Sequence, residues 1–500
     1  MSLSRRDCLR LGAAGAVLGS ASTLTGCSEV IRRTVPARER PATVALPPTI
    51  DPDPIVRLLN RAGFGPVPGD VARVATIGIT GYLDEQLNAP EDDSREGRGL
   101  QMRLGTIEAL TADPYDLNDL GDEEVLRQLS QASILRAVYS PFPLRERMVD
   151  FWSNHFNLYA RKRINSNDLS PVFVQCLVAR DSLNVIRRNA LGKFPAMLKA
   201  SARSPAMLTY LDNQKNRKGV ANENYAREIM ELHSLGVNSG YTQKDVQEVA
   251  RCLTGWTVEE GFLKNNGAFR FDPALHDDGE KVVLGHRIPA GGGESDGDTV
   301  LDILASHPWT ARFIARKMVK YLHGVDADGQ EDAELVSSVE KVYTTTGGDI
   351  AAMVRHILTA PQPPYPILKR PFDFVVSALR ASDANTDGSG GLIAHLQAMG
   401  QPLYEWPMPD GYPDKTAAWT GSLLARWNFA LALFERNGKV EGTTVPLPGA
   451  ISPEEMVERF LGRRAGDPAV APLVTALGKH AGQPAEMAAL VIASPAFQWR

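Results

Sequence analysis

The chain has 500 residues, of which 54 are basic and 59 acidic, so its formal net charge near neutral pH is −5. This slightly acidic balance argues against a protein that binds nucleic acid or anionic lipid through a strongly basic surface. Hydrophobic residues make up 43% of the chain and charged residues 23%, which is ordinary for a globular protein with a substantial core.

The first 26 residues have the features of an export signal. Arg5 and Arg6 precede a weakly apolar stretch over 11–24 that is rich in Ala and Gly. This stretch is far shorter than the ~20 strongly apolar residues that a membrane span needs, which favours a removable signal. The paired arginines are typical of twin-arginine translocation. We therefore expect export across the cytoplasmic membrane.

A lipid attachment site follows the apolar stretch. Leu24-Thr25-Gly26-Cys27 matches a lipobox, so Cys27 is the expected lipidated residue after removal of 1–26. Residues 28–54 are rich in proline and lack periodicity, which predicts a semi-extended tether. The sequence thus predicts a periplasmic or cell-surface lipoprotein that contacts the membrane through its lipid anchor.

The body, 55–500, is predicted to be mainly α-helical. Its helical segments share apolar residues at spacings of three and four. They cover 55–87 (short helices around a turn at 63–66), 124–139, 143–156, 169–180, 183–191, 299–322, 333–344, 350–359 and 370–381. Within 257–285 the period changes, which predicts a small β-hairpin or sheet excursion. The expected fold is a large multi-helix globular domain of the mainly α class.

The body is organised around two helices in the stretch that begins at Asn222. Asn222 is a plausible N-cap of the first helix, and Gly236 is placed to end it. Thr242 and Asp245 resemble a capping box that starts the second helix, which Gly255 ends. A rigid Pro-rich and aromatic loop is expected much later in the chain, over 400–413.

A polar stripe follows one face of the first of these helices. At about 100° per residue, Asn224, Arg227, Glu228 and Glu231 fall together on that face. The simplest interpretation is a solvated face with ion pairs of a few tenths of a kcal/mol each. The alternative is a functional pair of carboxylates next to a guanidinium.

Several segments together resemble one bacterial family. They are NRAGFGP (60–66), RERMVDFWSNHFN (145–157), YLDN (210–213), NENYAREIMELHSLGVNSGYTQKDVQEVARCLTGWT (222–257), FDPALHDDGEKVVLG (271–285), HPWTARFIARKMV (307–319), GQPLYEWPMPDGY (400–412) and SPAFQ (494–498). The resemblance is to the domain-of-unknown-function family numbered 1800 and covers about 55–500. It implies export and no assigned reaction. It also implies an exported phosphatase- or sulfatase-like partner, of the unknown-function family numbered 1501, which is often encoded beside such proteins.

One functional hypothesis is a hydrolase that acts on an extracytoplasmic polymer such as a polysaccharide. Glu228 and Glu231 are the predicted carboxylate pair, with Arg227 lowering the pKa of one of them. His155 or His276 is the predicted proton-transfer group near neutral pH. The predicted substrate-binding residues are polar groups and sugar-stacking aromatics: Asn154, Asp212, Asn224, Trp152, Trp256 and Tyr412.

Two alternatives remain open. In a metal-dependent hydrolase, His276, Asp277 and Asp278 are the candidate ligands of a divalent metal, although Asp-Asp-Gly is also a good hairpin turn. In a non-catalytic surface binding or assembly protein, the polar stripe and the Pro-rich loop form an interface with the phosphatase-like partner.

Overall fold

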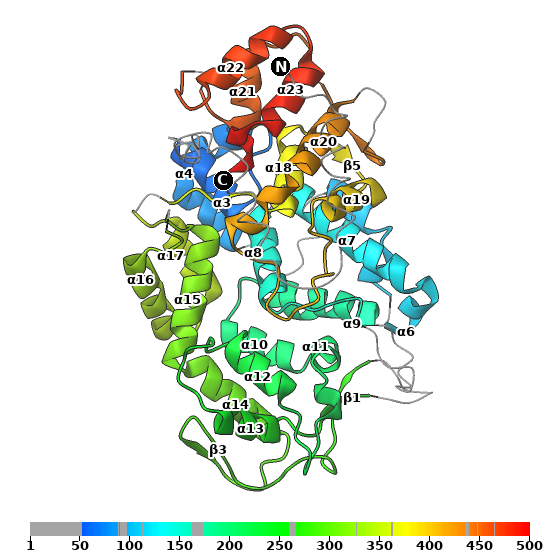
Figure 1. Cartoon of the computed structure of the whole chain (residues 1–500), viewed down its shortest axis with the longest axis vertical. Helices are drawn as coiled ribbons and strands as arrows, with labels where there is room; N and C mark the ends of the chain where they lie inside the picture. Colours follow the sequence, from blue (N-terminus) through cyan, green and yellow to red (C-terminus); the bar gives the residue numbers. More distant parts are fainter. Residues whose placement is uncertain are drawn as a thin grey trace, which may run out of the picture. The chain divides into compact units, whose positions relative to one another are not determined.

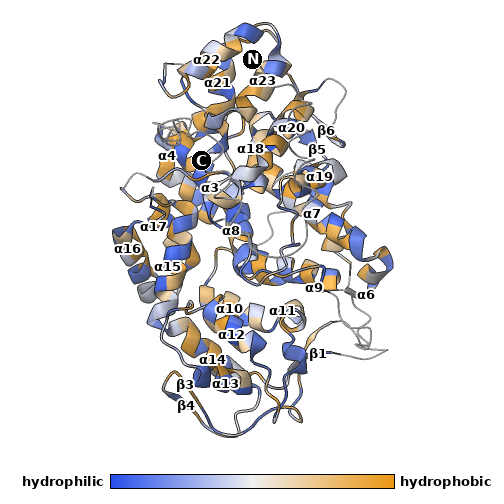
Figure 2. Ribbon diagram, viewed as in Figure 1, coloured by the Kyte–Doolittle hydropathy of each residue, from blue (hydrophilic) through white to orange (hydrophobic). Residues whose placement is uncertain are grey.

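The computed structural model describes most of the body and is mainly helical, as predicted (Figure 1). The described residues are 53–88, 90, 98–112, 114–162, 174–259, 267–326, 328–361, 364–435, 440–447, 449–464 and 466–500. The expected export signal, the lipidated Cys27 and nearly all of the tether lie outside these ranges, so they stay predictions. Most helices carry both polar and apolar residues, as amphipathic helices do (Figure 2).

Of the helices described before Asn222, five agree with the predicted segments, and those over 98–104, 114–117, 194–202 and 205–210 were not predicted. Asp53 caps the first of them by accepting a hydrogen bond from the amide of Ile55 (2.7 Å). They are α3 (Pro54–Ala62), α4 (Asp70–Leu87), α5 (Arg98–Leu104), α6 (Pro114–Leu117), α7 (Asp122–Tyr139), α8 (Pro143–His155), α9 (Val174–Asp181), α10 (Phe194–Ala202) and α11 (Pro205–Tyr210). Where 183–191 was expected to be an ordinary helix, a π-helical turn, Ser182–Arg187, follows α9 directly.

The two central helices are α12 (Glu223–Glu231) and α13 (Gln243–Cys252). The Asn222 cap and the Thr242–Asp245 capping box are confirmed. The prediction that α12 runs to Gly236 is wrong, because the helix ends at Glu231. The Ser234 hydroxyl donates to the carbonyl of Ile229 (2.6 Å) and so captures an acceptor that a longer helix would use.

The expected β excursion is confirmed and consists of two antiparallel pairs. Strand β1 (Trp256–Val258) pairs with β2 (Phe269–Phe271), and β3 (Lys281–Val283) pairs with β4 (His286–Ile288). A third pair, which the periodicity did not predict, joins two-residue strands far apart in the sequence. These are β5 (Asn385–Thr386) and β6 (Thr443–Thr444).

The remaining helices follow the β excursion. Pro308 divides the expected helix 299–322 in two, with His307 as the N-cap of the second part. They are α14 (Ser295–Ser306), α15 (Pro308–Leu322), α16 (Ala333–Thr346), α17 (Ile350–Leu358), α18 (Pro371–Ala381), α19 (Gly390–Ala398), α20 (Leu423–Phe434), α21 (Pro453–Leu461), α22 (Ala471–Leu477) and α23 (Pro484–Ala493). Among the described helices, none is long and apolar enough to cross a membrane.

Buried apolar side chains form two clusters. One joins elements from α3 to α17, and the other joins α18 to α23. Helix α7 belongs to both, since Leu129 packs in the first cluster and Ile134 in the second. The junction of the two clusters beside α7 and α8 is where the candidate site lies.

Candidate functional site

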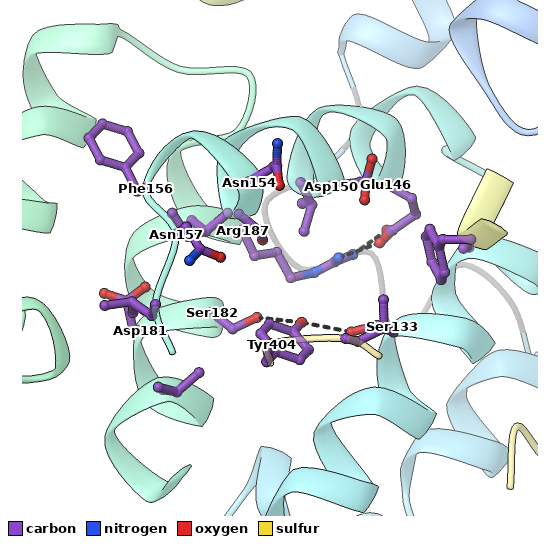
Figure 3. Close-up of a pocket in the computed structure, with 18 of the residues that line it drawn as sticks. Ser133, Glu146, Asp150, Asn154, Phe156, Asn157, Asp181, Ser182, Arg187 and Tyr404 are labelled. Carbon is purple, nitrogen blue, oxygen red and sulfur yellow. Dashed lines mark hydrogen bonds and ion pairs between the residues drawn. The ribbon is translucent and has the colours of Figure 1, made fainter. Parts of the chain in front are cut away.

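A cavity of about 80 Å³ lies where the two hydrophobic clusters meet, and it is called the α8 pocket below. One wall is a face of α8 that presents Glu146, Asp150 and Asn154 (Figure 3). These residues are four positions apart, so they lie above one another on the helix surface. The remaining walls come from α7, from the end of α9 with its π-helical turn, and from the Pro-rich loop 400–413. A volume of this size holds a few water molecules or a small polar group.

Asp181 is the most unusual side chain of the pocket. It is the last residue of α9, it is buried, and its Oδ1 has no hydrogen-bond partner among the described residues. The π-helical turn begins at the next residue and brings Ser182 and Arg187 to the same cavity. Such π turns inside α-helices are frequent at functional sites. Asp181 also lines a second, more open cavity on its other side, beside Arg203 and Phe269.

The environment of Asp181 favours its protonated form. Burial raises the pKa of Asp181 to about 7, and a hydrogen bond from Ser204 opposes this shift only in part. A carboxyl whose pKa lies near neutral can both give and take a proton under ordinary conditions. Asp181 therefore has the properties of a general acid or base.

The other two carboxylates of the pocket have arginine partners. Glu146 forms a two-pronged ion pair with Arg187, whose two terminal nitrogens lie 2.8 and 2.7 Å from its oxygens. Asp150 Oδ2 is contacted by the guanidinium of Arg370 and accepts a hydrogen bond from the Tyr321 hydroxyl (2.6 Å). In the described part of the chain, no hydrogen bond reaches Asp150 Oδ1. Asp150 is thus a charge-compensated carboxylate with one oxygen left for a ligand.

The Pro-rich loop 400–413 closes the pocket and is fixed by α8. The Asn154 side chain holds the main chain of Tyr412 from both sides, accepting from its amide (2.7 Å) and donating to its carbonyl (3.1 Å). The Asn157 side chain donates to the carbonyls of Trp406 (2.9 Å) and Met408 (2.7 Å). These bonds leave the loop little freedom, so the pocket is largely preformed.

Tyr404 is the strained residue of this loop. Its φ of 64° lies in the left-handed region, which a bulky side chain seldom adopts. Its hydroxyl is hydrogen-bonded to Ser133 (2.8 Å) and lies 3.4 Å from the hydroxyl of Ser182 (Figure 3). Strained backbone of this kind clusters at active sites and ligand clamps. The α8 pocket therefore combines a proton-exchanging carboxyl, a compensated carboxylate and a strained aromatic wall.

A family comparison covers nearly the whole body. A family model described as a protein of unknown function (DUF1800) matches residues 57–499. The chain belongs to DUF1800. No curated protein and no solved structure matches the chain significantly. The family description assigns no reaction to this DUF1800 chain.

The predicted carboxylate pair of the DUF1800 chain lies on α12, outside the lining of the α8 pocket. Arg227 contacts Glu231 (3.5 Å) and Glu223 (3.3 Å), as expected of a polar helix face. Burial raises the pKa of Glu228, the neighbouring Glu231 and Asp410 add to the shift, and Arg227 opposes it. Asp410 belongs to the Pro-rich loop, so its effect on Glu228 indicates that the predicted pair lies near that loop.

Two predicted substrate-binding residues, Asn224 and Asp212, make structural contacts around the start of α12. Asn224 donates to the carbonyl of Leu211 (3.1 Å), and Asn222 donates to that of Asp212 (3.2 Å). The Asp212 carboxylate pairs with Lys162 (2.9 Å). These contacts join α12 to the segment before it.

The two predicted histidines lie in separate buried clusters. His155 Nδ1 is 2.9 Å from Lys317 Nζ, and His155 Nε2 is 3.1 Å from the carbonyl of His233. Burial lowers the pKa of His155 well below its usual value, and Lys317 lowers it further. Burial also lowers the pKa of Lys317 to about 8. His155 therefore stays neutral at physiological pH and receives a hydrogen bond from Lys317.

The predicted metal ligands have partners within the protein. His276 and Lys281 both contact the buried carboxylate of Asp296, and Asp277 pairs with Arg251 (2.8 Å). The hydrogen bond from Arg251 lowers the pKa of Asp277 to about 2, although burial opposes this shift. Asp278 lies in the loop before β3 and accepts a hydrogen bond from the amide of Gly293 (3.3 Å). In the described ranges, no three His, Cys, Asp or Glu side chains converge in a way that suits a metal ion.

The predicted aromatic residues differ in position. Trp152 and Trp256 are fully buried in the first hydrophobic cluster, so neither offers a ring face to a ligand from solvent. Tyr412 lines the α8 pocket, together with Asn154. Of the predicted site residues, these two are the ones that the structure brings to the cavity.

The carboxyls of the pocket were missed by sequence reasoning. Glu146 and Asp150 did carry a signal, since with the predicted Asn154 they form a polar row at a spacing of four along one face of α8. Asp181 carried none. Its burial and the pairing of Arg187 with Glu146 depend on contacts between segments about 40 residues apart.

Proposed function

We propose that this protein is a hydrolase that acts on an extracytoplasmic polymer such as a polysaccharide, and that its chemistry takes place in the α8 pocket. The observation that carries the proposal is Asp181, a buried carboxyl on the wall of a cavity, with a pKa of about 7 and one oxygen that has no partner among the residues that the structure describes. Titratable groups whose environments push their pKa values apart are the usual sign of an acid and a base in one site.

The proposed reaction divides the work between two carboxyls. Hydrolysis of a glycosidic bond needs a carboxylic acid that protonates the leaving oxygen and a carboxylate that acts on the other side of the sugar. Protonated Asp181 gives its proton to the leaving oxygen as the carbon–oxygen bond breaks. Asp150 takes a proton from the water whose oxygen forms the new bond to carbon. Arg370 stabilises the carboxylate form of Asp150 through their contact.

The pocket favours a small group of the substrate over a long stretch of it. A cavity of about 80 Å³ with a preformed loop wall takes a chain end or a side group. The aromatic rings of Tyr404 and Tyr412 and the ring of Phe156 line it, and sugar rings pack well against such faces. The predicted export and lipid anchor would put this site in contact with extracytoplasmic polymers.

The test is hydrolysis of a polysaccharide panel by the purified full chain, followed by the release of reducing ends. With the cleaved substrate, Asp181→Asn should lower kcat/KM on the order of 10²–10⁴-fold, because the proton donor is lost. For the native chain, kcat/KM should fall above about pH 7, where Asp181 loses its proton. Asp302→Asn is the matched control, since that carboxylate is 62% exposed on α14; it should leave the rate unchanged.

Three outcomes would overturn this assignment. Equal rates for Asp181→Asn and Asp302→Asn would remove Asp181 from the reaction. Loss of activity in Glu228→Gln with full activity in Asp181→Asn would move the chemistry to α12, where burial and two neighbouring carboxylates raise the pKa of Glu228. A native chain that cleaves no member of the panel would favour the binding or assembly protein that works with a phosphatase-like partner.

A further inference from the structure

A second cavity, of about 60 Å³, lies beside Arg500, and none of its described lining residues belongs to the α8 pocket. Its walls come from α3, from α18 and the segment before it, from the end of α21 and from the residues that follow α23. Arg61, Lys369 and Arg500 are buried in these walls. Among the described residues that line the cavity, none is acidic. The cavity, called the cationic cavity, is therefore lined by basic side chains that are shielded from solvent.

Arg500 has two nitrogen donors that no group in the described part of the chain accepts from. Its side chain is 2% exposed, yet Nε and Nη1 have no hydrogen-bond partner among the described residues. The carboxylate of Asp373 lies 3.8 Å from Nε, which is too long for a hydrogen bond. Leaving buried donors of a charged group unsatisfied costs free energy, and a bound acceptor would remove that cost.

The neighbouring cations are compensated by neutral groups. Arg61 donates to the carbonyls of Leu322 (2.8 Å) and Tyr365. Lys369 lies over the ring of Phe497, 3.9 Å from its centroid, as a cation–π pair. Burial lowers the pKa of Lys369 to about 7 and that of Arg61 well below its usual value. Carbonyls and rings satisfy part of the hydrogen bonding but do not neutralise the charge.

Carboxylates nearby do not balance this charge either. Asp373 is already contacted by Arg147 and lies 3.8 Å from Arg370. Burial and then Arg147 lower the pKa of Arg500 to about 10, whereas Asp373 opposes the shift. Positive charge therefore exceeds negative charge at the base of the cavity, and buried charge without a partner is strongly unfavourable.

We propose that the cationic cavity binds a compact oxyanion, phosphate or sulfate, either free or as the end group of a larger molecule, through Arg500, Lys369 and Arg61. The planar fork of an arginine fits two oxygens of such an anion at once. The volume of about 60 Å³ suits one small group. The apolar side chains of Phe497 and Trp499 line the same cavity and would contact the rest of an organic anion.

Calorimetric titration of the full chain with inorganic phosphate, sulfate and acetate tests the proposal, with chloride at matched ionic strength as the reference. Phosphate and sulfate should bind with saturation at one site, and acetate should bind more weakly because it offers only two oxygens. Arg500→Gln should weaken phosphate binding at least about ten-fold, since it removes a charged hydrogen-bond donor. Arg464→Gln removes an exposed positive charge close in sequence to the cavity residue Arg463, and it should bind phosphate like the native chain.

Lys369→Gln provides a second variant if Arg500→Gln does not fold, with the same expected loss. Binding of glucose 1-phosphate as tightly as inorganic phosphate would identify the anion as an end group, while exclusion of the ester would restrict the site to the free ion. Two results would overturn the proposal. One is a heat of titration that depends on ionic strength and is the same for phosphate, sulfate and chloride. The other is unchanged phosphate binding in a folded Arg500→Gln or Lys369→Gln variant. None of these measurements depends on hydrolytic activity, so the two proposals fail separately.

Discussion

Two buried aspartates in different regions of the molecule show opposite behaviour. Asp181 lies in the α8 pocket, where no cationic side chain among the described residues pairs with it, and burial raises its pKa to about 7. Asp373 lies at the start of α18, where burial also pushes its pKa up, but Arg147, Arg500 and Arg370 outweigh this and hold it below its ordinary value. Burial alone therefore does not decide the charge of a carboxyl; its partners do.

The comparison separates a structural carboxylate from a chemically available one. Asp373 joins several basic side chains and must stay charged for them to remain buried. Within the described ranges, Asp181 keeps an oxygen without a hydrogen-bond partner and can change its protonation state without breaking an ion pair. The predictions below test this difference, from the largest expected effect to the smallest.

Asp373→Asn should lower the free energy of unfolding by about 3–5 kcal/mol, because it leaves buried arginines without their counter-charge. The native contribution of Asp373 is present above the unfolded pKa of about 4 and is lost as the pH falls through its lower folded pKa. Urea unfolding near pH 7 measures the loss. Asp302→Asn serves as the control. A change below about 1 kcal/mol for Asp373→Asn would contradict the compensating role of this carboxylate.

Lys281→Met should lower the free energy of unfolding by about 3 kcal/mol, because it takes a cationic partner away from a third buried carboxylate, that of Asp296. Lys281 contacts Asp296 and the carbonyl of Asp277, and its removal leaves Asp296 with His276 alone. Thermal and urea unfolding measure the effect. Lys244→Met, whose side chain is 75% exposed, provides a matched control with the same change. Equal stability of the two variants would show that Asp296 does not need Lys281.

Asp181→Asn should raise the free energy of unfolding, in contrast to the Asp373 and Lys281 variants. Between about pH 4 and pH 7 folded Asp181 holds a proton that the unfolded chain has lost, so native stability falls as the pH rises through this window. The size of the pKa shift limits the stability lost by the native chain to about 4 kcal/mol. The variant avoids this loss, but burying its new amide costs part of what it gains. We expect the variant to be more stable than the native chain by about 1–2 kcal/mol at pH 8. An equal difference at pH 5 and pH 8 would contradict the shifted pKa of Asp181.

Glu231→Gln should change stability least. Its partner Arg227 lies 3.5 Å away on a partly exposed helix face, and the Tyr241 hydroxyl is hydrogen-bonded to the same carboxylate, so the loss should be about 1 kcal/mol or less. Urea unfolding in low and in high salt measures this loss, which salt should reduce further. A cost above about 1 kcal/mol would mean that the α12 stripe is more than a solvated face.

The sequence predicted local structure better than the site. The Asn222 cap, the Thr242–Asp245 capping box and the β excursion depend on a few neighbouring residues, and each is confirmed. The predicted catalytic carboxylates were the ones that share a helix face, because periodicity shows only neighbours along one helix. Asp181 follows an apolar run in an ordinary helical pattern, and its isolation results from packing between distant segments. Arg500 shows no pattern at all.

The central claim is that Asp181 holds a proton near neutral pH within a preformed pocket. Infrared difference spectra of the native chain and Asp181→Asn, recorded from about pH 5 to about pH 9, test it directly. The account predicts a protonated-carboxyl band in the native chain that disappears with a midpoint near pH 7 and is absent from the variant at every pH. A native spectrum without that band at pH 5, or with a midpoint near the ordinary value of about 4, would contradict it.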